Sequence, residues 1–204
     1  MSSSQREAGT GEVERHFAET GALLLGHYKL SSGLHSDRYL QCARVLQWPA
    51  RAEALGAALA ARLRELAPAV VVSPAMGGLI IGHEVGRALG VRAVFAERVD
   101  GAFALRRGFA LAAGERVAVI EDVVTTGKST REVLDLVRSL GAEPVAAGSI
   151  VDRRARAEAL DTVDVVPFRS LLALDVAAWE KGACPLCGVG QTVITPGSRF
   201  LGKV

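Results

Sequence analysis

Short apolar runs alternate with longer amphipathic stretches through the middle of the chain. The runs are rich in Val, Ala and Ile and cover residues 69–73, 91–95, 117–120 and 144–151, with a weaker one at 163–166. Runs of this kind are typical of strands buried on both faces. The stretches between them predict helices over residues 49–66, 78–89 and 129–140. This alternation predicts an α/β fold, with a mainly parallel sheet and helices on both faces.

The N-terminal forty residues carry a weaker pattern. Residues 1–10 are polar and predict a frayed tail, and residues 13–19 predict a short helix. Residues 21–42 are expected to be irregular, because Gly26 and Gly33, with serines just before the second glycine, indicate a turn. No apolar stretch opens the chain or reaches the roughly 20 residues of a membrane span, so a soluble, cytoplasmic protein without a membrane partner is expected.

Length, charge and cysteine count narrow the functional classes. The chain of 204 residues is long enough for one domain with a substantial core, and its 50% hydrophobic content excludes a disordered protein. A formal net charge of +2 is too small for a protein that coats nucleic acid, so no such partner is expected. The three cysteines cannot all pair, which favours a reducing compartment.

The most informative segment follows the predicted strand at 117–120. Its residues are Glu121, Asp122, Val123, Val124, Thr125, Thr126, Gly127, Lys128, Ser129 and Thr130. The four hydroxyls, the loop N–H groups and the positive end of the following helix dipole suit a monophosphate. The two carboxylates suit the vicinal hydroxyls of a sugar, so a ribose 5-phosphate fits both halves. A Walker A loop is excluded, because Asp122 stands where that loop needs Gly and would repel the phosphates.

The stretch from Val117 to Ser129 resembles, without a gap, the phosphoribosyl-diphosphate signature of type I phosphoribosyltransferases. The resemblance implies the Rossmann-like core of that family, with phosphoribosyl diphosphate bound along the signature. Glu121 and Asp122 would be catalytic residues that hold the ribose hydroxyls, and residues 125–129 would hold the 5-phosphate. The implied cofactor is Mg²⁺, held by the substrate and reached by the two acids through water, with no ligand taken directly from the protein.

Further segments resemble the orotate phosphoribosyltransferases within this family. Residues 31–39 are similar to the segment that lines the pyrimidine, which implicates Ser31 and Tyr39, and Thr125 is expected at the same base. Arg153 follows an Asp at the end of a predicted strand, as does the family's Arg that holds the orotate carboxylate. A planar guanidinium can meet this planar anion in a bidentate manner, whereas a purine needs no such clamp.

The diphosphate is expected to meet two other segments. Ala75, Met76 and Gly77 resemble the family's diphosphate loop, although Gly77 stands where the commoner pattern has Lys. Arg98 resembles a basic residue at the start of a mobile loop, which in this family reaches the active site of the other subunit of a homodimer. Residues 98–108 hold three Arg but Asp100 as their one acid, so the diphosphate is expected as counter-charge and Arg98 is expected to act in trans.

The reaction implied by the resemblance is transfer of the phosphoribosyl group from phosphoribosyl diphosphate to orotate, a step of pyrimidine nucleotide synthesis. The alternatives are a purine phosphoribosyltransferase and a non-catalytic regulator that senses phosphoribosyl diphosphate. One phosphoribosyltransferase domain is expected over residues 13–204, after a flexible tail at 1–12. Its core would cover about 50–170, and a base-binding hood would come from about 17–48 and 171–204.

Cys184 and Cys187 form a Cys-x-x-Cys pair, which is half of a zinc site. The spacing of the four histidines gives no second ligand pair, so a structural turn without a required metal is expected. A metal completed by a second chain and a redox pair are the alternatives. His35 lies in the segment compared with the pyrimidine site and is a candidate there.

Overall fold

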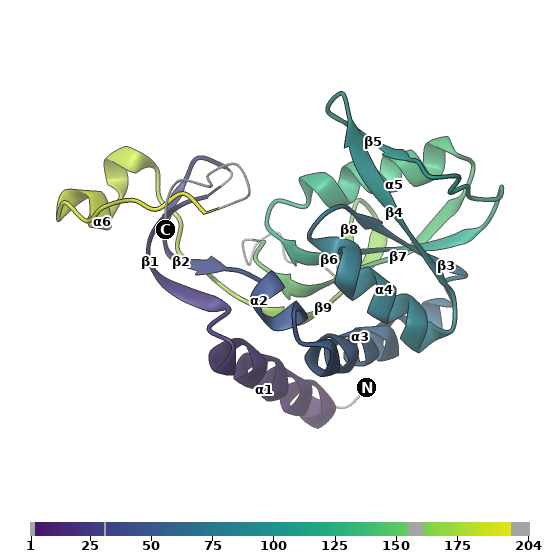
Figure 1. The fold of residues 1–204 in the computed structure, drawn as a ribbon, viewed down its shortest axis with the longest axis horizontal. Helices are drawn as coiled ribbons and strands as arrows, with labels where there is room; N and C mark the ends of the chain where they lie inside the picture. The colour runs from purple at the N-terminus through teal and green to yellow at the C-terminus, as the bar shows by residue number, and fades with distance from the viewer. Residues whose placement is uncertain (1–2, 31, 155–160, 197–204) are drawn as a thin grey trace.

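The computed structural model describes residues 3–30, 32–154 and 161–196. Seven strands of this part of the chain form one sheet in the order β5-β4-β3-β6-β7-β9-β8 (Figure 1). They are β3 (Val70–Pro74), β4 (Arg92–Val99), β5 (Ala102–Leu105), β6 (Arg116–Val124), β7 (Glu143–Asp152), β8 (Thr162–Val163) and β9 (Val166–Ala173). The five central strands are parallel, and the edge strands β5 and β8 are antiparallel to their neighbours. The predicted mainly parallel sheet is confirmed.

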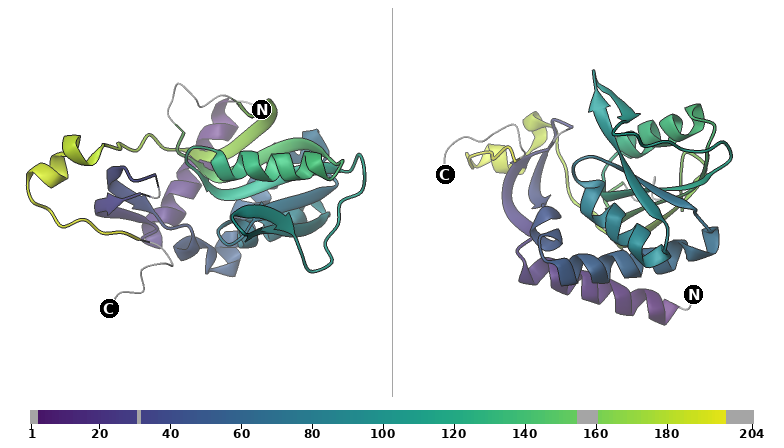
Figure 2. Two further views of the ribbon diagram at one scale, coloured as in Figure 1. Left: turned by 90° about the horizontal axis from the view of Figure 1, so that it is seen from above. Right: turned by 45° about the vertical axis from the view of Figure 1, so that its right-hand side comes forward.

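Helices cover both faces of the sheet (Figures 1 and 2). α3 (Pro49–Leu63) and α4 (Gly78–Leu89) lie on one face, and α5 (Lys128–Ser139) lies on the other. In β3, Val71 joins the core beneath α3 and α4, whereas Val72 joins the core beneath α5. Successive side chains of a strand point to opposite faces, which explains why the sequence needs an uninterrupted apolar run here.

The N-terminal helix is longer than the sequence indicated. α1 spans Ser3–Glu19, so the residues expected to form a frayed tail are helical from Ser3 onward. Val13 and Phe17 lie one turn apart and are both buried in the core. Once these two side chains anchor a helix, further turns add at little cost, because nucleation is the unfavourable step.

A β-hairpin replaces the irregular stretch expected at residues 21–42. β1 (Leu23–Lys29) and β2 (His35–Leu40) pair antiparallel, with an irregular register between Leu25 and Tyr28. This irregularity interrupts the alternation of exposed and buried side chains in β1, so the sequence pattern did not reveal a strand.

The hairpin and the C-terminal segment 175–196 together form a hood beside the sheet (Figures 1 and 2). Trp179 exchanges two backbone hydrogen bonds of 2.8 Å with His35 of β2, and Ile194 forms backbone bonds with His27 and Lys29 of β1. The C-terminal segment therefore borders the hairpin on both outer edges. The remaining short elements are α2 (Ala43–Leu46), α6 (Pro185–Gly188) and the 3₁₀ turns Arg64–Leu66 and Lys181–Ala183. Among the described helices, none has the length and apolar character needed to span a membrane.

The structure differs from the prediction in two stretches, the expected mobile loop at 98–108 and the expected strand at 163–166. The strand expected at 91–95 continues to Val99 and returns as β5, so much of the expected mobile loop is a hairpin. Its turn places Asp100 and Gly101 at positive φ, a conformation that these residue types tolerate. The strand expected at 163–166 is divided into β8 and β9 by a turn at residues 164–165.

Candidate active site

The two adjacent carboxylates lie near the carboxyl end of β6. Glu121 Oε2 accepts a hydrogen bond of 2.5 Å from the hydroxyl of Thr130, and Asp122 Oδ1 accepts one of 2.9 Å from Val123 N. Burial raises the pKa of Glu121 to about 7, and the neighbouring Asp122 carboxylate contributes to the rise. Burial also raises the pKa of Asp122. Carboxylates that have lost hydration are well suited to accept hydrogen bonds from the hydroxyls of a ligand.

The loop from β6 to α5 offers backbone N–H groups and hydroxyls at a helix N-terminus. Thr125 and Thr126 are exposed, and Thr126 Oγ1 accepts a hydrogen bond of 3.3 Å from Lys128 N. Gly127 turns the chain into α5 at a φ of 72°, which favours glycine. Because the first N–H groups of a helix have no acceptor within it, this loop can bind an anion.

Three residues of the segment 121–130 do not present side chains to this loop. The hydroxyl of Thr130 is buried and donates to Glu121, so the expectation that it binds phosphate is wrong. Val123 packs against the core beneath α3 and α4, and Val124 is buried beneath α5. These two valines can therefore contribute only backbone groups to a ligand. The side chain of Ser129, in the first turn of α5, is half-buried.

The turn of Ala75, Met76 and Gly77 joins β3 to α4 and lies against the acidic pair. A Cβ added at Gly77 would lie 2.6 Å from Asp122 Oδ1 and 2.9 Å from its Cγ. This is closer than van der Waals contact, so a side chain at this position would displace the carboxylate. Glycine thus fits the close approach of this turn to Asp122, and the fold brings the expected diphosphate loop and Asp122 into one site.

Arg98 lies near the acidic pair and is held by its own chain. Its guanidinium donates to Glu132 of α5 at 2.5 Å and to Gly101 O at 2.6 Å, and it lies 4.1 Å from the centre of the Phe103 ring. The charge of Arg98 also opposes the rise in the pKa of Glu121, although burial is the larger effect.

The fold supplies counter-charges that the sequence argument omitted. Arg107 pairs with Glu97 at 2.8 Å, in addition to the pair between Arg98 and Glu132. The inference that the loop arginines have too few acidic partners without a diphosphate is therefore wrong for Arg98 and Arg107, because their partners lie outside residues 98–108. Glu97 of β4 lies just before the loop in sequence, whereas Glu132 of α5 is distant in sequence but adjacent in the fold.

Tyr39 of the hood lies close to Asp122 and to Arg153, which follows β7. Burial raises the pKa of Tyr39, the Asp122 carboxylate raises it further, and Arg153 acts in the opposite direction, so all three groups are electrostatic neighbours. Burial lowers the pKa of Arg153. Its Nε is buried and has no hydrogen-bond partner within the described ranges. Ser31, the other hood residue expected at the base, lies outside the described residues.

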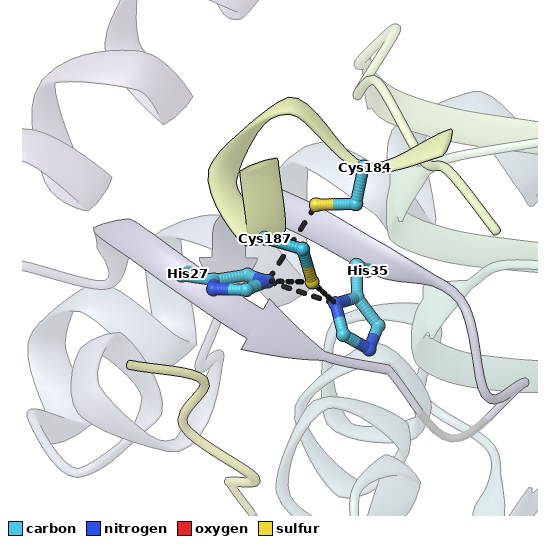
Figure 3. A group of neighbouring side chains, drawn as sticks. All are labelled: His27, His35, Cys184 and Cys187. Carbon is cyan, nitrogen blue, oxygen red and sulfur yellow. Dashed lines mark hydrogen bonds between the residues drawn. The ribbon is translucent and has the colours of Figure 1, made fainter. Parts of the chain in front are cut away.

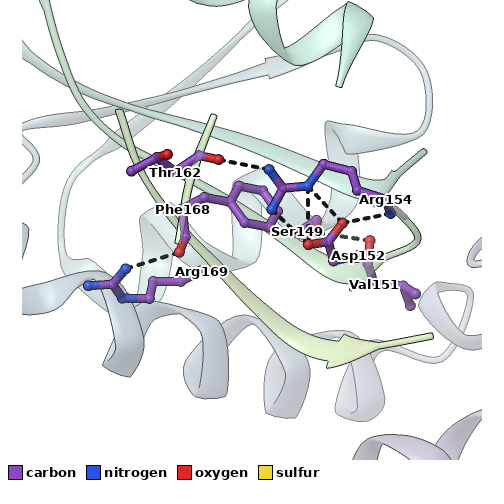
Figure 4. A network of polar contacts seen from close by, with 7 residues as sticks. All are labelled: Ser149, Val151, Asp152, Arg154, Thr162, Phe168 and Arg169. Atoms are coloured by element: carbon purple, nitrogen blue, oxygen red, sulfur yellow. Dashed lines mark hydrogen bonds and ion pairs between the residues drawn. The ribbon is translucent and has the colours of Figure 1, made fainter. Parts of the chain in front are cut away.

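The next residue, Arg154, has a different role from Arg153. It is buried, and its Nη2 and Nε donate to the Asp152 carboxylate at 2.7 Å and 2.9 Å (Figure 4). It also donates to Thr162 O at 2.8 Å, and its guanidinium lies 4.3 Å from the centre of the Phe168 ring. Asp152 therefore pairs with Arg154 and leaves Arg153 available to a ligand.

Four side chains that the sequence did not bring together meet in the hood. His27 of β1 and His35 of β2 lie beside Cys184 and Cys187, with ligand atoms within 4.8 Å of one another (Figure 3). The statement that the histidines give no second ligand pair is therefore wrong, and His35 does not serve the pyrimidine site. Recognition of the hairpin would have revealed the pair, because residues 27 and 35 flank its turn.

Comparisons with known proteins agree with this arrangement. The family described as phosphoribosyl transferase domain matches residues 41–183. Orotate phosphoribosyltransferase of Acidithiobacillus ferrooxidans is 50% identical over 193 residues, covering 93% of this chain and 97% of that protein. The enzyme of the same name from Caldanaerobacter subterraneus is 50% identical over 177 residues, covering 86% of this chain and 90% of that protein.

A solved structure shares the fold as well. The crystal structure of orotate phosphoribosyltransferase from Aeropyrum pernix matches with a TM-score of 0.66 and 25% identity, covering 78% of this chain and 92% of that one. Three findings agree: the signature at the end of β6, the mainly parallel sheet, and relatives that are 50% identical over most of the chain. The chain belongs to the phosphoribosyltransferase family and, within it, to the orotate phosphoribosyltransferases.

Proposed function

We propose that this enzyme forms orotidine 5′-monophosphate and diphosphate from orotate and phosphoribosyl diphosphate, with the 5-phosphate on the loop from Thr125 to Ser129. Glu121 and Asp122 accept hydrogen bonds from the ribose hydroxyls. The ring nitrogen of orotate bonds to the anomeric carbon as the bond to diphosphate breaks, so positive charge develops on the sugar. Positioning the reactants and stabilising this charge are then the main sources of catalysis.

The buried Nε of Arg153 is the observation that carries the assignment of the base. An unsatisfied buried donor costs roughly 1–3 kcal/mol, and more if charged, so an acceptor at this atom gains that energy back. Orotate brings a carboxylate, whereas adenine and hypoxanthine bring none. We also assign to the pyrimidine ring Tyr39, an electrostatic neighbour of Asp122 and Arg153, and the exposed Thr125.

Mg²⁺ fits the site because Glu121 and Asp122 are half-buried hard oxygen donors beside the expected diphosphate loop. We propose that the substrate's diphosphate and ribose hydroxyls bind the ion, with these two carboxylates reached through water. The bound ion would neutralise charge on the leaving diphosphate. Arg98, Ala75, Met76 and Gly77 would bind the same group.

We also propose that the enzyme works as a homodimer in which Arg98 serves the partner's site. The ion pair of Arg98 with Glu132 is exposed, and exposed pairs contribute about 0–1 kcal/mol, so a diphosphate can replace Glu132 readily. In this arrangement each site is completed by a residue of the other subunit.

The test of the function is a panel of bases with phosphoribosyl diphosphate and Mg²⁺. We expect the enzyme to consume orotate, which the decrease in its ultraviolet absorbance measures. Uracil, adenine and hypoxanthine should react far more slowly. Turnover of a purine without turnover of orotate would instead establish the purine alternative. Binding of phosphoribosyl diphosphate without turnover of any base would establish the regulator.

The raised pKa of Glu121 predicts two pH effects. Activity needs the ionised carboxylate, so kcat/KM should rise with pH through about 7, and Glu121→Gln should lack this rise.

The free energy of unfolding should change with pH in the opposite direction. Between the ordinary pKa of 4.5 and about 7 the folded chain holds a proton that the unfolded chain releases, so stability falls as pH rises.

Urea unfolding of the wild type and Glu121→Gln at about pH 5 and about pH 8 measures the second effect. The amide does not titrate, so the wild type should lose up to about 3 kcal/mol relative to the variant over this interval. Parallel pH dependence of the two proteins would contradict the buried, proton-binding Glu121.

A further inference from the structure

We propose that His27, His35, Cys184 and Cys187 bind a structural zinc ion that fastens the two ends of the chain together in the hood. The four side chains come from β1, β2 and the turn that begins α6 (Figure 3). Two imidazoles and two thiolates form one of the common ligand sets of structural zinc sites. The pair Cys184 and Cys187 also has the two-residue spacing that such sites use.

The distances between the ligand atoms match a tetrahedral site. The two Sγ atoms lie 3.5 Å and 3.7 Å from His27 Nε2, and Cys187 Sγ lies 3.3 Å from His35 Nδ1. His27 Nε2 and His35 Nδ1 are 2.8 Å apart. Zn–N bonds of about 2.0–2.1 Å and Zn–S bonds of about 2.3 Å give ligand separations of roughly 3.3–3.8 Å in a tetrahedron. Binding of an ion at the centre therefore requires the two imidazoles to move apart from 2.8 Å and the most widely spaced ligand atoms, which lie within 4.8 Å, to approach each other.

The second nitrogen of His27 is already held as in a metal site. His27 Nδ1 lies 2.7 Å from Gln191 O, a carbonyl that can accept but not donate. The proton of the neutral ring is therefore on Nδ1, and Nε2 presents its lone pair to the two sulfur atoms and His35. A backbone carbonyl that fixes the tautomer of a ligating histidine is a usual feature of zinc sites.

Apart from its backbone hydrogen bonds and a few buried side chains, the hood has little apolar packing among its described residues. Its apolar side chains Leu25, Val189 and Ile194 are 75%, 78% and 50% exposed, and the two main cores lie beneath the helices of the sheet. Cys184 is nevertheless 4% exposed, and His27 and His35 are 1% and 4% exposed. Small structural units without a sufficient core commonly use a metal for stability, because its binding free energy becomes folding free energy.

The zinc also affects orotate binding; this part of the inference rests on the proposed function. β2 carries His35 near its start and Tyr39 near its end. Release of the metal would therefore loosen the strand that presents Tyr39 to orotate. We expect removal of zinc to raise KM for orotate more than KM for phosphoribosyl diphosphate, which binds to the sheet.

Metal analysis of freshly purified, untagged enzyme is the first test. We expect about one tightly held zinc per chain, and a melting temperature that falls with a strong chelator and recovers with zinc. Cobalt in place of zinc should give the visible spectrum of a tetrahedral site with thiolate charge-transfer bands. Absence of zinc together with failure of the metal-free protein to bind zinc or cobalt would overturn the proposal, as would a disulfide between Cys184 and Cys187 in the native enzyme.

Single substitutions then assign the ligands. Cys184→Ser, Cys187→Ser and His35→Ala should each lose the zinc, whereas the controls Cys42→Ala and His83→Ala should keep it. Cys42 is the third cysteine, and His83 is an exposed histidine on α4 outside the cluster. Retention of zinc in the first three variants would assign the metal elsewhere and overturn the site. If a variant does not fold, the cobalt spectrum of the wild type still decides the ligand type. Loss of zinc without the expected rise in KM for orotate would reject only the link to catalysis.

Discussion

Asp122→Asn should lower kcat/KM by about tenfold or more, while the enzyme stays folded. A hydrogen bond to a charged group contributes about 1.5–3 kcal/mol, and about 1.4 kcal/mol corresponds to a factor of ten. The amide keeps an oxygen to accept the bond from Val123 N, and it removes a charge whose pKa burial has raised. Steady-state kinetics with both substrates, with circular dichroism as a check on folding, measures the effect.

Asp135→Asn is the matched control, because Asp135 is an exposed acid on α5 that pairs with Arg138 at 3.1 Å. It should have wild-type kinetics. Wild-type kinetics in Asp122→Asn as well would remove Asp122 from the site.

The same variant tests the shared site. Asp122→Asn subunits mixed with inactive Arg98→Ala subunits should regain part of the activity, because one site of each hybrid dimer then has both residues intact. A mixture that is no more active than its parents after confirmed subunit exchange would show that Arg98 acts within its own chain, where it now pairs with Glu132.

Arg153→Ala should raise KM for orotate by roughly ten- to a hundredfold and leave KM for phosphoribosyl diphosphate nearly unchanged. The sharpest measurement is the ratio of kcat/KM for orotate to that for uracil, which lacks the carboxylate. The variant should lose most of this ratio, because the guanidinium acts on that group alone. An unchanged ratio would refute the carboxylate clamp.

The neighbouring arginine separates binding from stability. Arg153→Ala removes a half-buried side chain whose buried Nε has no partner in the described structure, so the free energy of unfolding should not fall. Arg154→Ala leaves Asp152 buried without its counter-charge, which should cost about 3–5 kcal/mol in the free energy of unfolding. Urea unfolding of the two variants distinguishes the roles of these adjacent residues.

Local sequence determined the parts of this protein that depend on short-range physics. The apolar runs of β3 and β6 predict buried parallel strands because both faces of each strand need apolar side chains. The acids and hydroxyls after β6 predict a sugar-phosphate site because a strand end, a loop and a helix N-terminus follow directly along the chain. The choice of Arg153 over Arg154 rests on the resemblance, and the structure adds the physical difference that Arg154 pairs with Asp152.

Contacts between distant segments were decided by the tertiary structure. The carboxylate of Asp122 occupies the space next to Gly77, and Glu132 reaches Arg98 across the face of the sheet. His27 and His35 meet Cys184 and Cys187, about 150 residues later, because the C-terminal segment returns to the hairpin. The sequence did not reveal this contact, because the irregular register of the hairpin obscured its strands. Such contacts follow from how whole elements pack, and spacing along the chain carries no record of them.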